Sequence, residues 1–183
     1  MTGLKQKEGS TSQVKLAWNK VSGATGYEIY QYHTKDKKYV MIGTTTTTSK
    51  TIGGLKPGTS YSFKVRAYKK VKGKNYYGAT SSALTATTKL QRPIILSVRS
   101  KSKKAISIML KKAPSVSGSQ ISVSTSKDFK NSTTMNRTTK KTTYLVTNLK
   151  SKKKYYVKVR VYKTVNNKKI FSDWSPVKAI NVR

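Results

Sequence analysis

The sequence predicts an all-β protein made of two consecutive copies of one unit of about 90 residues. The segment 55–69 returns as 149–163 at an offset of 94 residues, so that Arg66 and Tyr68 correspond to Arg160 and Tyr162. Apolar residues recur at every second position in the longest apolar segments, which is the period of a strand. No segment combines a sustained helical period with a capping residue.

The strands follow from the spacing of apolar residues. Val14, Leu16 and Trp18 alternate with polar or small side chains, as in a strand with one buried face. The segment 61–68 alternates in the same way, and 155–162 repeats it in the second copy. Shorter runs with β-branched and aromatic residues predict further strands at 27–32, at 39–42 and from 77 towards 88.

The boundary between the copies is predicted in the short segment from Thr88 to Pro93, where Pro93 suits the start of a strand. We therefore predict one domain at 1–89 and a second at 90–183. Each is long enough to fold alone if its core is well packed.

Composition restricts the chemistry of the chain. Lys and Arg number 39 against 5 Asp and Glu, a net charge of +34, and cysteine is absent. The absence of cysteine excludes disulfides, thiolate metal sites and cysteine nucleophiles. No apolar run of about 18 residues predicts a membrane-spanning helix. The first residues have no apolar stretch, so we expect the signal peptide of an exported protein to lie outside this sequence.

Four short motifs resemble those of the fibronectin type III family: a tryptophan on the second strand, a Gly-Tyr-Glu-Ile-Tyr strand, a tyrosine corner and a late Trp-Ser element. They are Trp18, 26–30, Leu55-x-Pro-Gly-Thr-x-Tyr61 and 172–175. The resemblance implies two tandem seven-stranded antiparallel β-sandwiches, related to the immunoglobulin architecture. It also implies structural roles for Trp18, Tyr61, Tyr155 and Trp174.

The segments 21–30 and 155–163 are similar to lysine-rich repeats of secreted, cell-surface proteins from Gram-positive, clostridia-like bacteria. In such proteins the modules are spacers or adhesive units beside a catalytic or wall-anchoring domain. The second copy departs from the first, because Leu110 replaces Trp18 and Ser119 replaces Tyr27. We therefore expect its core to be packed differently, around Trp174.

Catalytic residues are not found in the sequence. His33 is the single histidine and stands in a Thr-Lys-Asp turn without a serine motif or a carboxylate framework. The five carboxylates are scattered and form no calcium or glycosidase motif. We expect no catalytic residues, no metal and no cofactor.

Tyr30, Tyr32, Arg66 and Tyr68 share one strand parity and form a candidate ligand face for a sugar ring or a base. The alternative, which we favour, is cross-strand aromatic and Tyr–Arg packing that stiffens the sheet.

The charge is carried mostly by lysine. Residues 1–91 hold 16 basic and 3 acidic side chains, net +13, and residues 92–183 hold 23 and 2, net +21. A candidate anion patch is Lys150, Lys152, Lys153 and Lys154, and a second cluster is Lys101, Lys103 and Lys104. These lysines either form a solvated, self-repelling surface or attract an anionic wall polymer.

Two functions remain open. The first is a non-catalytic tandem fibronectin type III segment of an exported bacterial surface protein, acting as a spacer or adhesive module. The second is a module that binds carbohydrate or an anionic cell-wall polymer, accessory to a hydrolase elsewhere. The expected partners are a cell-wall polymer, a polysaccharide or a host surface protein, rather than nucleic acid, since arginine forks for bases are missing. We expect a monomer at the cell surface or outside the cell, without membrane insertion.

Overall fold

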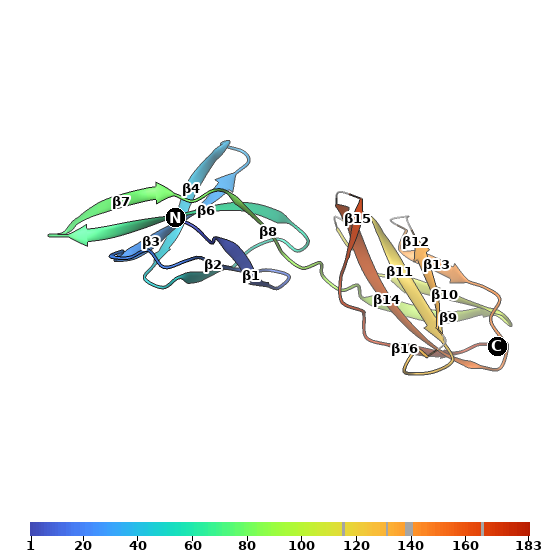
Figure 1. Cartoon of the computed structure of the whole chain (residues 1–183). Helices are drawn as coiled ribbons and strands as arrows, with labels where there is room; N and C mark the ends of the chain where they lie inside the picture. The colour runs from blue at the N-terminus through green and yellow to red at the C-terminus, as the bar shows by residue number, and fades with distance from the viewer. Residues whose placement is uncertain (115, 131, 138–140, 166) are drawn as a thin grey trace. The chain divides into compact units, whose positions relative to one another are not determined.

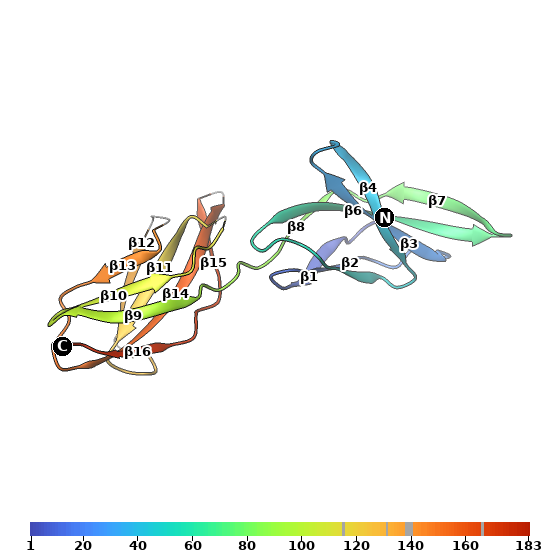
Figure 2. The ribbon, with the colours of Figure 1, turned by 180° about the vertical axis from the view of Figure 1, so that it is seen from behind.

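The computed structural model describes residues 1–114, 116–130, 132–137, 141–165 and 167–183. It divides the chain into two compact units, Met1–Lys89 and Leu90–Arg183. Each unit is a sandwich of two antiparallel sheets, seen from opposite sides in Figure 1 and Figure 2. The described residues form strands, turns and irregular connections without a helix, and hence without a helix that could cross a membrane.

The first unit has a small and a large sheet. The small sheet has the strand order β1 (Lys5–Gly9), β2 (Val14–Ala17), β5 (Ser49–Ile52). The large sheet has the order β4 (Lys38–Thr45), β3 (Gly26–His33), β6 (Ser60–Val71), β7 (Lys74–Thr80), and β8 (Leu84–Thr87) also pairs with β6. Counting β7 and β8 as one interrupted strand gives the seven strands that the sequence predicts.

The second unit repeats this topology in its described residues. Its small sheet has the order β13 (Thr143–Val146), β10 (Ala105–Leu110), β9 (Ile95–Ser102). Its large sheet has the order β12 (Thr133–Arg137), β11 (Gly118–Ser124), β14 (Lys154–Val165), β15 (Lys168–Phe171), with β16 (Lys178–Asn181) also paired with β14. All-β architecture in two tandem sandwiches is therefore confirmed.

The two cores contain the inward residues of the alternating strands. In the first unit Trp18 packs edge-on against Tyr27, with ring centroids 5.4 Å apart, above the fully buried Phe63. Trp18 itself follows β2 and is only 5% exposed. The second core has Leu110 in the place of Trp18, as the repeat predicts.

The expectation that the second core is packed around Trp174 is wrong, since Trp174 is outside the buried cluster. Tyr144 of the opposite sheet supplies the missing bulk, and its hydroxyl donates to Ser119 Oγ at 3.3 Å. Ser119 stands where the first unit has Tyr27. The Tyr144 ring of β13 therefore packs over a position that has no aromatic side chain in the second unit. A small pocket of about 20 Å³ lies beside Leu110, Ser119 and Tyr144.

Both tyrosine corners are present. The Lys56 N–H donates to the Tyr61 hydroxyl at 2.8 Å, and the Lys150 N–H donates to the Tyr155 hydroxyl at the same distance. The left-handed residue of the corner is Gly58 (φ 60°) in the first unit and Lys152 (φ 54°) in the second. The corner therefore survives the loss of its glycine, because the hydrogen bond and the packing of the ring hold the turn.

The last strand of the large sheet is interrupted by a buried serine in both units. Ser81 separates β7 from β8, and the Val65 N–H donates to its Oγ at 3.0 Å. Ser175 receives the Val159 N–H in the same way at 3.0 Å. A side-chain oxygen thus replaces a backbone partner where the strand bends, which explains why the predicted run from 77 to 88 appears as two strands.

Replacing Ser81 by alanine is expected to destabilise the first unit by about 1–3 kcal/mol, because the buried Val65 N–H loses its side-chain acceptor. Ser82→Ala is the control, since the Ser82 side chain is exposed one residue further along. Urea unfolding followed by circular dichroism measures both. Equal stability of the two variants would show that Ser81 Oγ contributes nothing.

Candidate functional site

The outer face of the large sheet in the first unit brings the predicted ligand residues onto two neighbouring strands. β3 places Glu28 and Tyr30 on this face, and β6 places Arg66 and Tyr68 there. Glu28 is opposite Arg66 in the register, and Gly26 is opposite Tyr68. A Cβ at Gly26 would lie 2.6 Å from the Tyr68 hydroxyl, so the glycine lets the Tyr68 ring lie over the strand.

The centre of this face is a network of Glu28, Tyr30 and Arg66. Glu28 Oε2 accepts the Tyr30 hydroxyl at 2.6 Å, and Arg66 donates to it from Nε at 3.1 Å and from Nη2 at 2.8 Å. Arg66 Nη2 also donates to the Tyr30 hydroxyl oxygen at 2.8 Å. Glu28 is buried and Arg66 is partly exposed, so the pair is shielded on one side.

The network changes the acidity of its members. Burial alone raises the pKa of the Glu28 carboxyl, but the hydrogen bonds from Tyr30 and Arg66 and the Arg66 charge together hold it below its usual value. Burial and the hydrogen bond to Glu28 raise the pKa of Tyr30. The hydrogen bond to Glu28 raises the pKa of Arg66. Glu28 is therefore a stable anion at neutral pH.

Tyr77 of β7 completes the group. The Arg66 guanidinium carbon lies 4.0 Å from the centre of the Tyr77 ring and 5.5 Å from that of Tyr30. Tyr68 packs edge-on against Tyr77 with ring centroids 6.4 Å apart. Arg66 is thus held between two rings and a carboxylate, with its Nε and Nη2 donors engaged by Glu28 and Tyr30.

Tyr32 is not brought into this group. It packs edge-on against Tyr39 of β4 at 5.2 Å, and Lys64 Nζ lies 4.5 Å from the centre of the Tyr39 ring. The Tyr39 hydroxyl is 2.8 Å from Ser62 Oγ. The four predicted residues therefore belong to two neighbouring packing groups on one face.

The same face of the second unit has the same plan with different residues. Arg160 Nε donates to Gln120 Oε1 at 2.7 Å, where Gln120 takes the place of Glu28. The Arg160 guanidinium carbon lies 3.9 Å from the centre of the Phe171 ring and 4.6 Å from that of Trp174. Lys158 Nζ lies 5.0 Å from the centre of the Trp174 ring. The Trp174 ring therefore packs on the Arg160 and Lys158 side chains of the outer face and does not enter the core.

Comparison with known proteins agrees with this geometry. Residues 2–83 match the family model described as fibronectin type III domain. The first unit is a fibronectin type III domain. Over nearly the whole chain, the fold matches a two-domain fibronectin type III segment of chicken tenascin, with a TM-score of 0.67, 15% identity, and coverage of 99% of this chain and 98% of that one. Both units thus have the fibronectin type III fold.

The curated relatives include bacterial polymer-degrading enzymes and, at 40% identity over 70 residues (35% of this chain and 7% of that protein), an ephrin type-A receptor 3 of Danio rerio. A poly(3-hydroxybutyrate) depolymerase of Ralstonia pickettii is 35% identical over 88 residues, which are 48% of this chain and 16% of that protein. Chitinase D of Niallia circulans is 33% identical over 94 residues, 50% of this chain and 17% of that protein. Exoglucanase B of Cellulomonas fimi is 35% identical over 91 residues, 48% of this chain and 8% of that protein. The chain spans less than a fifth of the length of these relatives.

The lysines of the predicted anion patch lie in and beside the turn that precedes β14 of the second fibronectin type III unit. Lys150, Lys152, Lys153 and Lys154 all have exposed side chains. The Lys154 ammonium lies 5.7 Å from the centre of the Tyr156 ring, a wide cation–π contact. The patch is therefore a solvated cationic surface.

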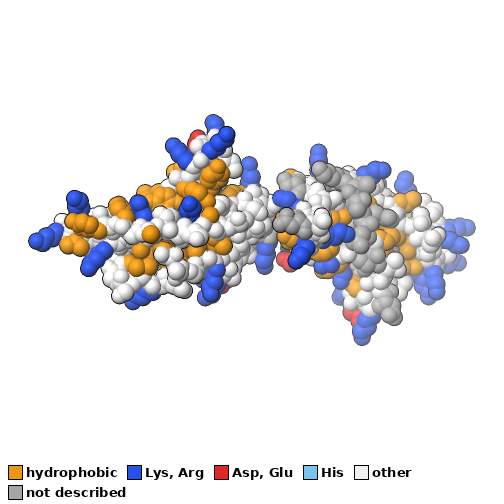
Figure 3. Space-filling model, turned by 45° about the horizontal axis from the view of Figure 1, so that its top comes forward, with side chains coloured by type: hydrophobic (Ala, Val, Ile, Leu, Met, Phe, Trp, Pro, Cys, Tyr) orange, Lys and Arg blue, Asp and Glu red, His pale blue; other side chains and the backbone are white. Residues whose placement is uncertain are grey.

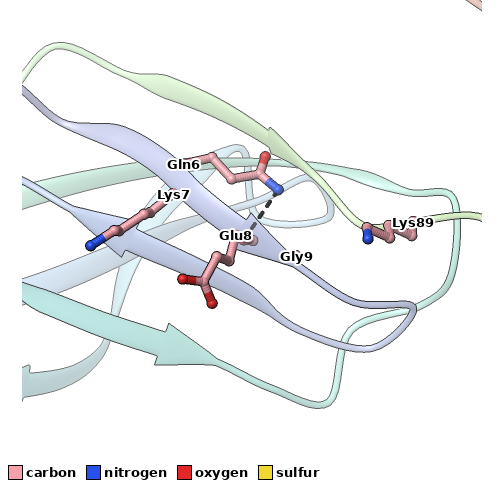
Figure 4. Close-up of a pocket in the computed structure, with 5 residues that line it drawn as sticks. All are labelled: Gln6, Lys7, Glu8, Gly9 and Lys89. Carbon is pink, nitrogen blue, oxygen red and sulfur yellow. Dashed lines mark hydrogen bonds between the residues drawn. The ribbon is translucent and has the colours of Figure 1, made fainter.

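A shallow pocket lies at the edge of the first fibronectin type III domain, lined by Gln6, Lys7, Glu8, Gly9 and Lys89. Figure 4 shows that Lys7, Glu8 and Lys89 do not converge on a common point. Gln6 instead joins β1 to β8, since its Nε2 donates to the Thr87 carbonyl at 3.0 Å and its Oε1 accepts the Thr87 N–H at 2.9 Å. This pocket is part of the sandwich edge, without a set of groups aimed at a ligand.

The ionisable groups elsewhere are dispersed. His33 Nδ1 lies 3.6 Å from Asp36 Oδ2, and both side chains are well exposed. Within the described ranges no three His, Cys, Asp or Glu side chains lie close enough to hold a metal ion.

Sequence reasoning missed Glu28 and did not connect Tyr77, which it took as part of a second candidate site with Tyr76, to Arg66. Glu28 was treated as one scattered carboxylate, although it shares the strand parity of Tyr30 and corresponds to Gln120, which has a similar length. Tyr77 aligns with Phe171, so an aromatic ring at this position of both copies was the available signal. Only the pairing of β6 with both β3 and β7 places these side chains around one arginine.

Proposed function

We propose that the chain is a non-catalytic accessory segment of an exported bacterial protein, acting as a spacer that also presents an adhesive surface. The observation that carries the proposal is the outer face of the first unit, where internal contacts occupy Glu28, Tyr30 and Arg66. A polar group already satisfied inside a sheet stiffens the fold and offers little to a ligand.

The bacterial relatives support the accessory role. They are named as a depolymerase, a chitinase and an exoglucanase, and the part that matches this chain is at most 17% of each. The three names denote different polymers, so the three proteins are not expected to share one catalytic domain. The short segment that they share with this chain is therefore better explained as a repeated module. We infer that this chain likewise accompanies a polymer-degrading domain, without turnover of its own.

The proposed setting is the outside of a Gram-positive, clostridia-like cell, with the chain monomeric beside the wall and able to meet a host surface protein. The lysine-rich, cysteine-free composition supports this setting. Molecules with the same large positive charge repel one another, and a chain without cysteine needs no oxidative folding.

A second candidate is carbohydrate binding, which the exposure of two neighbouring tyrosines favours. Tyr76 and Tyr77 of β7 are 56% and 49% exposed. An exposed ring can stack on the apolar face of a sugar. The packing of Tyr77 on Arg66 leaves only part of its ring for this purpose.

Sedimentation with insoluble cellulose, chitin, starch and poly(3-hydroxybutyrate) distinguishes the two candidates. We expect the protein to stay in the supernatant at moderate salt and to release no soluble product. Retention on one polymer that Tyr76→Ala abolishes would establish the binding module instead. Met41→Ala is the matched control, because Met41 is also half exposed (50%) but lies on β4. Turnover that survives repurification would contradict the non-catalytic role.

A further inference from the structure

Two lysine clusters that are far apart in the sequence meet at one end of the second unit. Lys101 lies near the end of β9, and Lys103 and Lys104 form the turn to β10; the connection from β13 carries Lys150, Lys152 and Lys153, and Lys154 begins β14. The Leu149 N–H donates to the Lys104 carbonyl at 3.0 Å, which places the two turns side by side. These seven lysines are called the basic cap below.

The backbone of the basic cap is ordered by the end of β16. The Lys152 N–H donates to the Val182 carbonyl at 3.0 Å, and the Val182 N–H donates to the Lys153 carbonyl at 3.0 Å. Lys154 is opposite Asn181 in the sheet register. These hydrogen bonds hold the backbone of the turns in place. Binding of a ligand therefore costs little conformational entropy for ordering the turns.

The basic cap has no internal counter-charge. The segments 99–105 and 148–154 contain no Asp or Glu, and the side chains of all seven lysines are exposed. The loop after β11 leaves the same end of the sandwich and carries Asp128, whose Oδ2 lies 3.5 Å from Lys130 Nζ. Figure 3 shows Lys and Arg side chains gathered at the end of the second unit, at the right of the view.

The composition of the basic cap indicates what it can recognise. The seven groups that define the cap are lysines, which act as point charges and lack the planar fork that arginine uses for base edges; Arg99 is the one arginine in the two segments and lies on β9, opposite Ser107. The segments 99–105 and 148–154 contain no Tyr, Trp or Phe to stack on a sugar or a base, and the neighbouring Tyr156 ring lies 5.7 Å from the Lys154 ammonium. Adjacent ammonium groups on two turns suit a linear polymer that repeats a negative charge on every unit, as a polyphosphate or a phosphodiester chain does.

We propose that the basic cap binds a linear phosphate polymer without bases, through several lysine–phosphate contacts along the polymer chain. The interaction releases counter-ions from the polymer, so its strength falls steeply with salt. It anchors the second unit to a phosphate-rich surface polymer, and it is independent of whether the first unit is a spacer or binds carbohydrate.

The test uses inorganic polyphosphate as the probe and two fourfold variants with equal charge. The cap variant is Lys150→Gln, Lys152→Gln, Lys153→Gln, Lys154→Gln. The control removes four exposed lysines around the β6–β7 hairpin of the first unit, as Lys69→Gln, Lys70→Gln, Lys72→Gln, Lys74→Gln. The match extends to the backbone, since Lys72 (φ 47°) and Lys152 (φ 54°) are both left-handed. Circular dichroism confirms that each variant is folded.

We expect the cap variant to bind polyphosphate about 30-fold more weakly at 0.15 M KCl, and to lower the slope of log affinity against log salt by about 2–3. The control is expected to change the affinity less than about threefold. Equal losses in the two variants would overturn the proposal, because only diffuse charge would then act.

Two further polymers identify the ligand class. Poly-L-glutamate of equal charge is expected to bind several-fold more weakly than polyphosphate, and oligodeoxythymidine of equal phosphate number is expected to bind no more tightly. Equal binding of polyglutamate would show that any polyanion suffices and would overturn the phosphate assignment. Tighter binding of the oligonucleotide would overturn it in favour of nucleic acid.

Discussion

Replacing Trp18 by alanine destabilises the first unit by about 3–5 kcal/mol, the largest effect expected for a single substitution in this chain. Trp18 is 5% exposed and packs on Tyr27 in the centre of the buried cluster, so its removal leaves a cavity that a rigid sandwich cannot close. Differential scanning calorimetry measures the change, since loss of Trp18 also removes the fluorescence signal of this unit.

Trp174→Ala is the matched control, because the two tryptophans are the only ones in the chain and lie one in each unit. Trp174 covers Arg160 and Lys158 on the outer face, so its loss removes cation–π contacts worth about 1 kcal/mol rather than core volume. Equal destabilisation by the two substitutions would contradict the assignment of Trp174 to the surface.

The indole nitrogen of Trp18 refines this expectation. Trp18 Nε1 is buried and is the one described side-chain nitrogen or oxygen of this kind that lacks a hydrogen-bond partner. An unsatisfied buried donor costs free energy, so part of the packing energy of the ring is offset. Trp18→Phe is therefore expected to lose much less stability than Trp18→Ala, since it keeps an aromatic ring and removes the unsatisfied donor.

Replacing Arg66 by methionine destabilises the first unit by about 2–4 kcal/mol at neutral pH, because the buried Glu28 carboxylate loses its cation. The value is below that of a fully buried pair, since the Arg66 side chain is 29% exposed and partly screened by water. Methionine keeps the apolar stem of the arginine, so that loss of packing contributes little. Fluorescence of Trp18 in a Trp174→Phe background follows this unit alone.

The loss also depends on pH in a defined direction. In the native unit the pKa of Glu28 is lowered, so its contribution to stability is present above the unfolded pKa of about 4.3 and is lost as the pH falls through the folded value. Without Arg66, the burial that raises the pKa of Glu28 is opposed by fewer contacts that lower it. Protonation of Glu28 then removes the unpaired buried charge. The deficit of Arg66→Met is therefore expected to shrink on acidification from pH 7 to pH 3, and a constant deficit would contradict the role of Glu28.

Glu28→Gln separates charge from hydrogen bonding, and the second unit provides its precedent. Gln120 accepts from Arg160 at 2.7 Å in the equivalent position, so an amide oxygen can satisfy this arginine. The comparison indicates that the arginine between rings is the common element of the two units. The carboxylate adds a pH-dependent contribution in the first unit only.

The fold was largely predictable because it depends on local patterns. The alternation at Val14, Leu16 and Trp18 and at 61–68 identifies the buried face of each strand, and the repeat identifies the two units. The tyrosine corner is a local hydrogen bond between Tyr61 and Lys56, five residues apart, so its motif is visible in the sequence. The parity of Arg66 and Tyr68 likewise placed both on the outer face.

The arrangement of the side chains across strands was not predictable to the same degree. Glu28 and Arg66 are 38 residues apart, and their contact depends on the register between β3 and β6. The replacement of a Trp18–Tyr27 pair by Leu110 and Tyr144 depends on which opposing residue can reach the space across the sandwich. A single sequence contains no direct signal for such choices, which depend on packing between sheets.

Periodicity, motif residues and charge are local properties, so the sequence alone is enough to predict two all-β units with strongly cationic, lysine-rich surfaces and a tyrosine corner in each. The tertiary structure adds that Glu28, Tyr30 and Arg66 contact one another on the predicted ligand face, that Trp174 packs on the outer face, and that two lysine turns meet at one end of the second unit. These features require strand register and the hydrogen bond from Leu149 to Lys104, which join residues distant in the sequence.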